Sequence, residues 1–201
     1  MEVTAPRVED PAPASAGVLP RGTSLLAALL FVSANTMVLA GLLTAWFVTK
    51  GATRAWPPEG VTVDTYIPTI VAVTAAMGAV AVQWAVWAIR RNDQRSATVA
   101  LVLTVALGLA MLNVEWYELS RASFGLADHA YGTLYYLILG YHLVVVAIGL
   151  VSLVVVGARI LAGHLGSPDY DAVRAAATTW QYVNASWLFI GLALFVFSPH
   201  G

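Results

Sequence analysis

Residues 130–158 read AYGTLYYLILGYHLVVVAIGLVSLVVVGA and contain no Asp, Glu, Lys or Arg. A run of more than about 18 apolar residues is long enough to cross the hydrocarbon core of a bilayer. Backbone N–H and C=O groups cannot stay unpaired in hydrocarbon, so such a segment must be helical. Four further stretches share this apolar character, and together the five predict helices over residues 22–49, 65–89, 96–117, 130–158 and 175–198.

The composition of the 201-residue chain agrees with a membrane protein. Apolar residues make up 59 % and charged residues 10 %, with a mean hydropathy of +0.76, whereas an ordinary soluble domain is about 25 % charged. We therefore expect an all-α fold, a bundle of five transmembrane helices that forms one domain over residues 22–201. We interpret the acidic, proline-rich residues 1–21 as a disordered tail rather than a signal peptide.

The net charge and the absence of cysteine narrow the classes of function. A net charge of −1 argues against a nucleic-acid partner. A chain without cysteine has no disulfide, no Cys-ligated zinc, no iron–sulfur cluster and no thiolate copper site.

The basic residues predict the orientation of the helices. Positively charged loops stay on the cytoplasmic side of a membrane. The N-terminal tail and the second and fourth connections hold seven arginines, whereas the other two connections hold three basic residues. The first set is Arg7, Arg21, Arg90, Arg91, Arg95, Arg159 and Arg174, and the second is Lys50, Arg54 and Arg121. The N-terminus is therefore predicted to be cytoplasmic and the C-terminus outside.

A few polar residues lie within the predicted helices. Asn35 and His142 are both near the middle of their helices, so they can meet and pair, either as an interhelical hydrogen bond or as part of a proton relay. Gln181 and Asn184 share one face of the last helix and can hold hydrogen bonds or lipid headgroups. Glu115 is about 28 Å from the inner end of the third helix, so we expect it to face headgroup water or a partner chain.

Aromatic residues concentrate near the predicted helix ends. Trp46, Trp56, Tyr131 and Trp180 are among them, and we interpret the set as the amphipathic belt found at membrane interfaces. We assign lipid headgroup contact to the arginine and tryptophan residues at the inner end.

No catalytic or metal site is visible in the sequence. His142 is the one histidine within a predicted helix, so this chain alone cannot supply two axial ligands to a haem. There is no nucleophile–base pair and no phosphate-binding loop. Such a chain is usually a subunit of a larger complex or a carrier.

Several motifs resemble subunit III of the haem–copper terminal oxidases, in order, across about residues 24–198. Residues 34–43 (ANTMVLAGLL) are similar to the family's S-E-x-x-F-F-x-G-x-F helix, and Trp56-Pro57-Pro58 matches its W-P-P loop. Glu115 and the following aromatics resemble an E-Y stretch. Residues 130–142, with Tyr131, Gly132 and His142, resemble Y-G-S-x-F…G-F-H, and residues 179–184, with Trp180, Gln181 and Asn184, resemble Y-W-H-F-V-D.

Three positions depart from the family pattern. The family's intramembrane Glu is Asn35 here, and the His and Asp of its last motif are Gln181 and Asn184. These amides keep shape and hydrogen bonding but cannot exchange protons, which puts any proton-linked role of the family residues in doubt.

The resemblance implies the short, five-helix bacterial form of a non-catalytic subunit in the plasma membrane. It implies oxidase subunits I and II as partners, with haem and copper in those subunits and none in this chain. It also implies bound phospholipid and a place in a respiratory complex, which can itself join a larger supercomplex. Two alternatives stay open: an accessory subunit of another respiratory complex such as nitric oxide reductase, and a small secondary carrier.

Overall fold

The computed structural model describes residues 22–62, 64–166 and 170–197, which form five helices and contain no strand, so the all-α prediction is confirmed. The tail predicted for residues 1–21 lies outside the described residues. The helices are α1 (Thr23–Ala52), α2 (Tyr66–Arg90), α3 (Gln94–Arg121), α4 (Ala130–Leu161) and α5 (Asp171–Gly191), and α5 continues into a turn of π-helix, η1 (Leu192–Val196).

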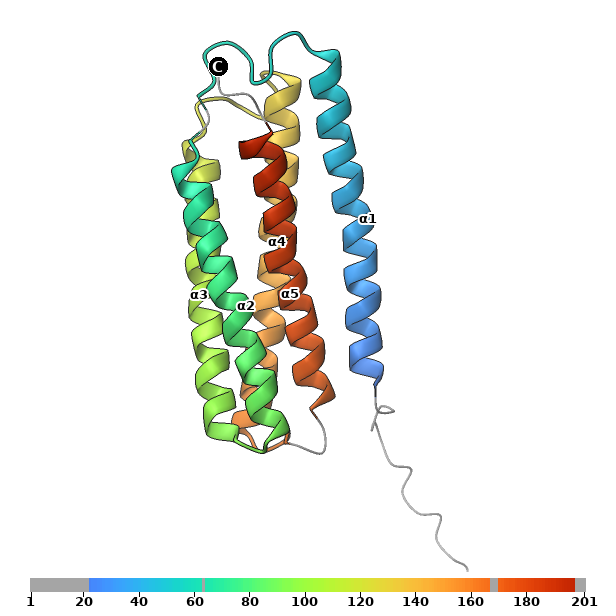
Figure 1. Ribbon diagram of the computed structural model, residues 1–201, viewed down its shortest axis with the longest axis vertical. Coiled ribbons are helices and arrows are strands. Elements are labelled where there is room, and N and C mark those ends of the chain that lie inside the picture. Colours follow the sequence, from blue (N-terminus) through green and yellow to red (C-terminus); the bar gives the residue numbers. More distant parts are fainter. Residues whose placement is uncertain (1–21, 63, 167–169, 198–201) are drawn as a thin grey trace, which may run out of the picture.

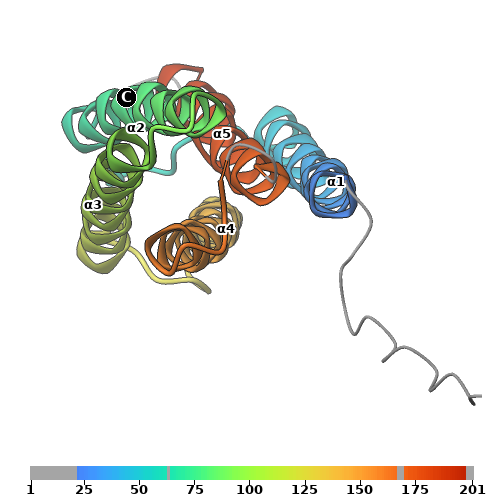
Figure 2. The ribbon, with the colours of Figure 1, turned by 90° about the horizontal axis from the view of Figure 1, so that it is seen from below.

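The helices run roughly parallel to one long axis, and consecutive helices point in opposite directions (Figure 1). Helices α2, α3, α4 and α5 form a closed ring in which each packs against two neighbours, and α1 packs outside this ring against α5 and α4 (Figure 2). Helix α1 is therefore the most exposed helix of the described chain.

The α2–α3 turn, the end of α4 and the start of α5 lie at the same end of the bundle as the start of α1 (Figure 1). In the α2–α3 turn, Asp93 caps α3 by accepting a hydrogen bond from the Ser96 backbone N–H at 3.0 Å. Hydrogen bonds from the Ser96 hydroxyl and backbone N–H lower the pKa of the Asp93 carboxyl. At the same end, Asp171 accepts from the Gly22 backbone N–H at 2.7 Å and so joins the first turn of α5 to the start of α1.

Four helices, α1 to α4, are long and apolar enough to cross a membrane, judged by length and composition over the described residues. Helix α5 is not among them, although a fifth span was predicted over residues 175–198. The reason is its place in the ring: α5 packs against α1, α2 and α4 and carries polar residues on buried faces, among them Thr179, Asn184 and Ser186.

Trp180 of α5 fills the centre of the ring where three helices each present a glycine. A Cβ added to Gly108 of α3 would lie 2.5 Å from the indole, and one added to Gly149 of α4 would lie 3.0 Å from it. At Gly78 of α2 the corresponding distance is 3.2 Å. Small residues thus let three backbones close around one large side chain.

The predicted interfacial belt is wrong for four of its residues. Trp180, Trp46, Trp56 and Tyr131 are all buried inside the protein. The physical reason is that tryptophan is also the largest available core side chain, and a bundle with many small residues leaves space that it can fill. The lipid-contact role assigned to Trp180 falls with this correction.

We predict that Gly108→Ala destabilises the protein by about 1–3 kcal/mol, because the new methyl group would overlap the rigid indole of Trp180 and the side chain of Leu150. The measurement is the unfolding midpoint in detergent micelles. Gly140→Ala is the matched control, because a Cβ there has no neighbour within 4 Å and alanine is the better helix former. Equal effects of the two substitutions would contradict this account of the core.

Candidate functional site

A buried pair of ionisable side chains joins α3, α4 and α5. Glu115 Oε2 and His142 Nδ1 are 2.9 Å apart, and both side chains are 0 % exposed. The other ring nitrogen, His142 Nε2, is 3.1 Å from the backbone carbonyl oxygen of Val183 on α5. The Trp187 ring lies beside the imidazole, with centroids 5.3 Å apart.

The partners of His142 restrict the protonation states of the pair. A carbonyl oxygen only accepts, so the hydrogen bond to Val183 requires a hydrogen on Nε2. The contact with Glu115 then holds one hydrogen, either on Nδ1 of a charged imidazolium or on the carboxyl group. In both cases the net charge of the pair is zero, which is the condition for burying it away from water.

Two sequence predictions are corrected here. Glu115 does not face headgroup water or a partner chain, and His142 does not pair with Asn35. Helix α3 continues to Arg121, so Glu115 lies about 9 Å inside its end. A signal for this was present: Glu115 continues the series of buried α3 residues spaced three or four apart, namely Leu101, Thr104, Gly108 and Met111.

Asn35 takes part in a second polar group, which attaches α1 to the ring. The Tyr141 hydroxyl on α4 contacts the Asn35 carbonyl oxygen at 2.9 Å and its Oδ1 at 3.2 Å. Tyr141 and the Tyr182 hydroxyl on α5 are 2.8 Å apart. The Asn35 amide N–H₂ donates to the Phe31 carbonyl oxygen at 2.9 Å. If Tyr182 donates to Tyr141, Tyr141 can donate onward to Asn35, and three helices are joined.

The two amides predicted on α5 behave differently from each other. Gln181 donates from Nε2 to the Ala79 carbonyl oxygen of α2 at 3.0 Å. Asn184 is buried beside Gly78, and its amide makes no hydrogen bond with the described residues. Gln181 therefore supports the α2–α5 contact, whereas Asn184 is buried with both polar atoms of its amide unpaired among the described residues.

The remaining motif residues meet at the other end of the bundle. Trp56 packs against Trp46 and Tyr131 with ring centroids 4.8 Å and 5.0 Å away, and Pro57 follows it, half-buried, after a cis peptide bond. Gly132 accommodates the loop before α4, because a Cβ there would lie 2.6 Å from the Gly125 carbonyl oxygen. These residues fix the α1–α2 connection onto the start of α4.

The contacts of His142 give it a structural role. Among the described residues, no group of three or more His, Asp or Glu side chains could hold a metal ion. Both ring nitrogens of His142 already have protein partners, so ligating a haem would break at least one of these contacts.

We predict that His142→Leu or Glu115→Leu alone destabilises the protein by about 3–5 kcal/mol, because each leaves a buried ionisable group without its partner. The double variant should lower the free energy of unfolding by less than either single variant, because no ionisable group of the pair then remains without its partner. The measurement is the free energy of unfolding in mixed micelles. Additive effects would show that the two side chains do not depend on each other.

Comparison with known proteins agrees with the resemblance seen in the sequence. Residues 19–199 match the family described as cytochrome c oxidase subunit III. A relative named cytochrome c oxidase subunit 3 from Arabidopsis thaliana is 31 % identical over 174 residues, which is 83 % of this chain and 66 % of that protein. The chain thus spans just under two thirds of the length of this relative.

The match covers a larger share of two other relatives of the same name. The protein from Thermostichus vulcanus is 25 % identical over 173 residues, 86 % of each chain. The protein from Spodoptera frugiperda is 31 % identical over 142 residues, 70 % of this chain and 97 % of the relative. With a family match across nearly its whole length and four helices apolar enough to cross a membrane, this chain belongs to the cytochrome c oxidase subunit III family.

Proposed function

We propose that this chain is the non-catalytic subunit III of a respiratory haem–copper oxidase, that it stabilises subunit I and that it holds phospholipid. The family match supports the assignment to subunit III. The complex would reduce dioxygen to water with electrons from cytochrome c or quinol and would couple this reaction to proton translocation. Haem and copper would be held by the partner subunits.

The main observation in favour of a structural role is that both ring nitrogens of His142 have protein partners. Its two ring nitrogens contact Glu115 and the Val183 carbonyl oxygen. Among the described residues, His142 therefore links three helices, and binding a redox centre would displace at least one of its two contacts. A bundle joined in this way would offer subunit I a stable docking surface.

Docking to subunit I would stabilise the complex by mass action, because a partner that binds only the assembled state shifts the equilibrium toward it. Glycines on the helices differ in whether another helix can reach them. Gly78 and Gly149 are occupied by Trp180, whereas Gly140 and Gly157 of α4 have no neighbour within 4 Å of an added Cβ. These two glycines allow close approach of another helix.

We place all five helices across a bacterial plasma membrane, with the N-terminus cytoplasmic and the C-terminus outside. Helix α5 is 21 residues long, about 32 Å at the usual rise, and its polar side chains face other helices, so it can span without high hydropathy. The arginine-rich connections lie at one end of the bundle, the end where α1 starts (Figure 1). The positive-inside rule then favours this orientation.

A tagged copy of the chain, purified in mild detergent, should bring down a larger haem-containing subunit. We predict that Asn35→Ala lowers this recovery more than it alters proton pumping per electron, because Asn35 helps to join α1 to α4. The measurements are haem per tagged chain and proton release by reconstituted vesicles.

Ser33→Ala is the matched control, since the Ser33 hydroxyl bonds only within its own helix, to the Leu29 carbonyl oxygen. Recovery of the chain as a haem-free homo-oligomer would refute the subunit assignment. Intact assembly with lost pumping in Asn35→Ala would refute the structural role of Asn35.

A further inference from the structure

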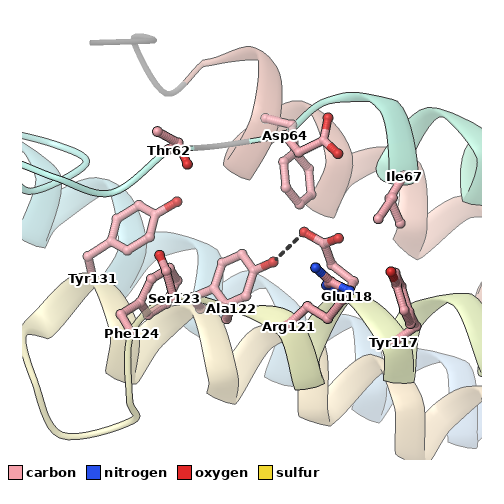
Figure 3. Close-up of a pocket in the computed structure, with 12 residues that line it drawn as sticks. Thr62, Asp64, Ile67, Tyr117, Glu118, Arg121, Ala122, Ser123, Phe124 and Tyr131 are labelled. Carbon is pink, nitrogen blue, oxygen red and sulfur yellow. Dashed lines mark hydrogen bonds between the residues drawn. The ribbon is translucent and has the colours of Figure 1, made fainter.

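A polar cavity of about 340 Å³ (Figure 3) opens at the end of the bundle where α3 ends and α4 starts. Its walls come from the start of α2 and the segment before it, from the end of α3 and the connection that follows, from the start of α4 and from η1. It is separate from the buried pair on α3 and α4, which does not line it. In a membrane-spanning bundle, helix ends lie at the level of the lipid headgroups.

The cavity carries more negative than positive charge. Asp64 and Glu118 lie on opposite walls, and Arg121 lies next to Glu118 (Figure 3). Glu118 Oε1 accepts a hydrogen bond from the Tyr135 hydroxyl at 3.0 Å. Within the described residues Arg121 makes no ion pair with either carboxylate, and its guanidinium lies 5.4 Å from the Tyr117 ring centroid. Two carboxylates and one guanidinium therefore face the same space without neutralising each other.

The hydroxyl group of Tyr131 is a further polar group at this cavity. The Tyr131 side chain lines the cavity and is only 1 % exposed, and its hydroxyl makes no hydrogen bond with another described residue. The aromatic walls come from Tyr117, Phe124, Tyr131, Tyr135 and Phe195. Aromatic faces next to carboxylates are the surroundings that organic ammonium groups prefer.

We propose that this cavity binds a phosphoethanolamine group. Asp64 and Glu118 would hold the ammonium between the aromatic faces, while Arg121 and the Tyr131 hydroxyl would bind the phosphate. A bare divalent cation fits less well, because the described lining offers two carboxylates and a few hydroxyl groups, whereas Ca²⁺ takes about six to eight oxygen ligands. The group can come from the headgroup of an aminophospholipid or from a free amine, and the chemistry is the same.

This inference rests on the lipid-holding part of the proposed function and assigns it a place and a headgroup. The subunit role is tested independently by haem recovery, so either can fail alone.

The test uses the full chain with its co-purifying subunits, reconstituted in vesicles of phosphatidylethanolamine and phosphatidylglycerol and then re-extracted. Lipid retained per chain is measured by native mass spectrometry. Phosphatidylethanolamine should be retained in preference to phosphatidylglycerol. Glu118→Gln should lower that retention about tenfold or more, the effect of losing one charge-assisted contact. The variant amide can still accept from Tyr135, so the fold should survive.

Glu59→Gln is the matched control, because Glu59 is an exposed carboxylate in the same loop as Asp64 and does not line the cavity. If Glu118→Gln is poorly folded, Asp64→Asn replaces it, with the same expected loss of phosphatidylethanolamine retention.

The free amine is tested as the second source of the group by adding phosphoethanolamine to vesicles of phosphatidylglycerol alone. Binding under these conditions means that the site accepts the free amine. Equal retention of both lipids without binding of the free amine, or retention unchanged in the cavity variants, would overturn the proposal.

Discussion

The contact among Glu115, His142 and the Val183 carbonyl oxygen is the interaction on which the bundle depends, because it gives both imidazole nitrogens and one oxygen of the buried carboxyl group a partner that hydrocarbon could not supply. It joins three of the four ring helices through side chains that water does not reach. Its net charge is zero in either protonation state, so the ring can enclose it without burying a free charge. A pair of this kind fixes the relative position of helices better than apolar packing, which drives little association in lipid.

Packing around Trp180 is the second interaction that holds the ring helices together. Glycines of α2, α3 and α4 allow these backbones to close on one indole, so the ring has a rigid centre. Helix α1 lies outside the ring. It is attached by the buried side chain of Trp46, which packs against Tyr131 of α4, and by the Tyr141 hydroxyl, which bridges Asn35 and Tyr182. A rigid ring with one peripheral helix is therefore the architecture of this member of the subunit III family.

The sequence predicts the helices well because hydrocarbon permits few backbone solutions, and charge-free runs such as residues 130–158 mark them. Partners of polar side chains were harder to predict. Asn35 and His142 have similar depths, but depth does not specify the face, and each has a different partner. Glu115 was misplaced because the length of α3 was underestimated, although its spacing from Met111 and Gly108 already put it on the buried face. Trp180 was read as interfacial because composition alone does not separate belt from core.

The central claim is that the buried pair supports the fold and exchanges no proton with water. The most direct test is the ¹⁵N NMR spectrum of His142 in the purified, reconstituted protein, recorded from about pH 5 to about pH 8, where an ordinary histidine changes charge. The account predicts chemical shifts of both ring nitrogens that do not change across this range. Shifts that titrate while the protein stays folded would contradict it, because the pair would then be accessible to protons.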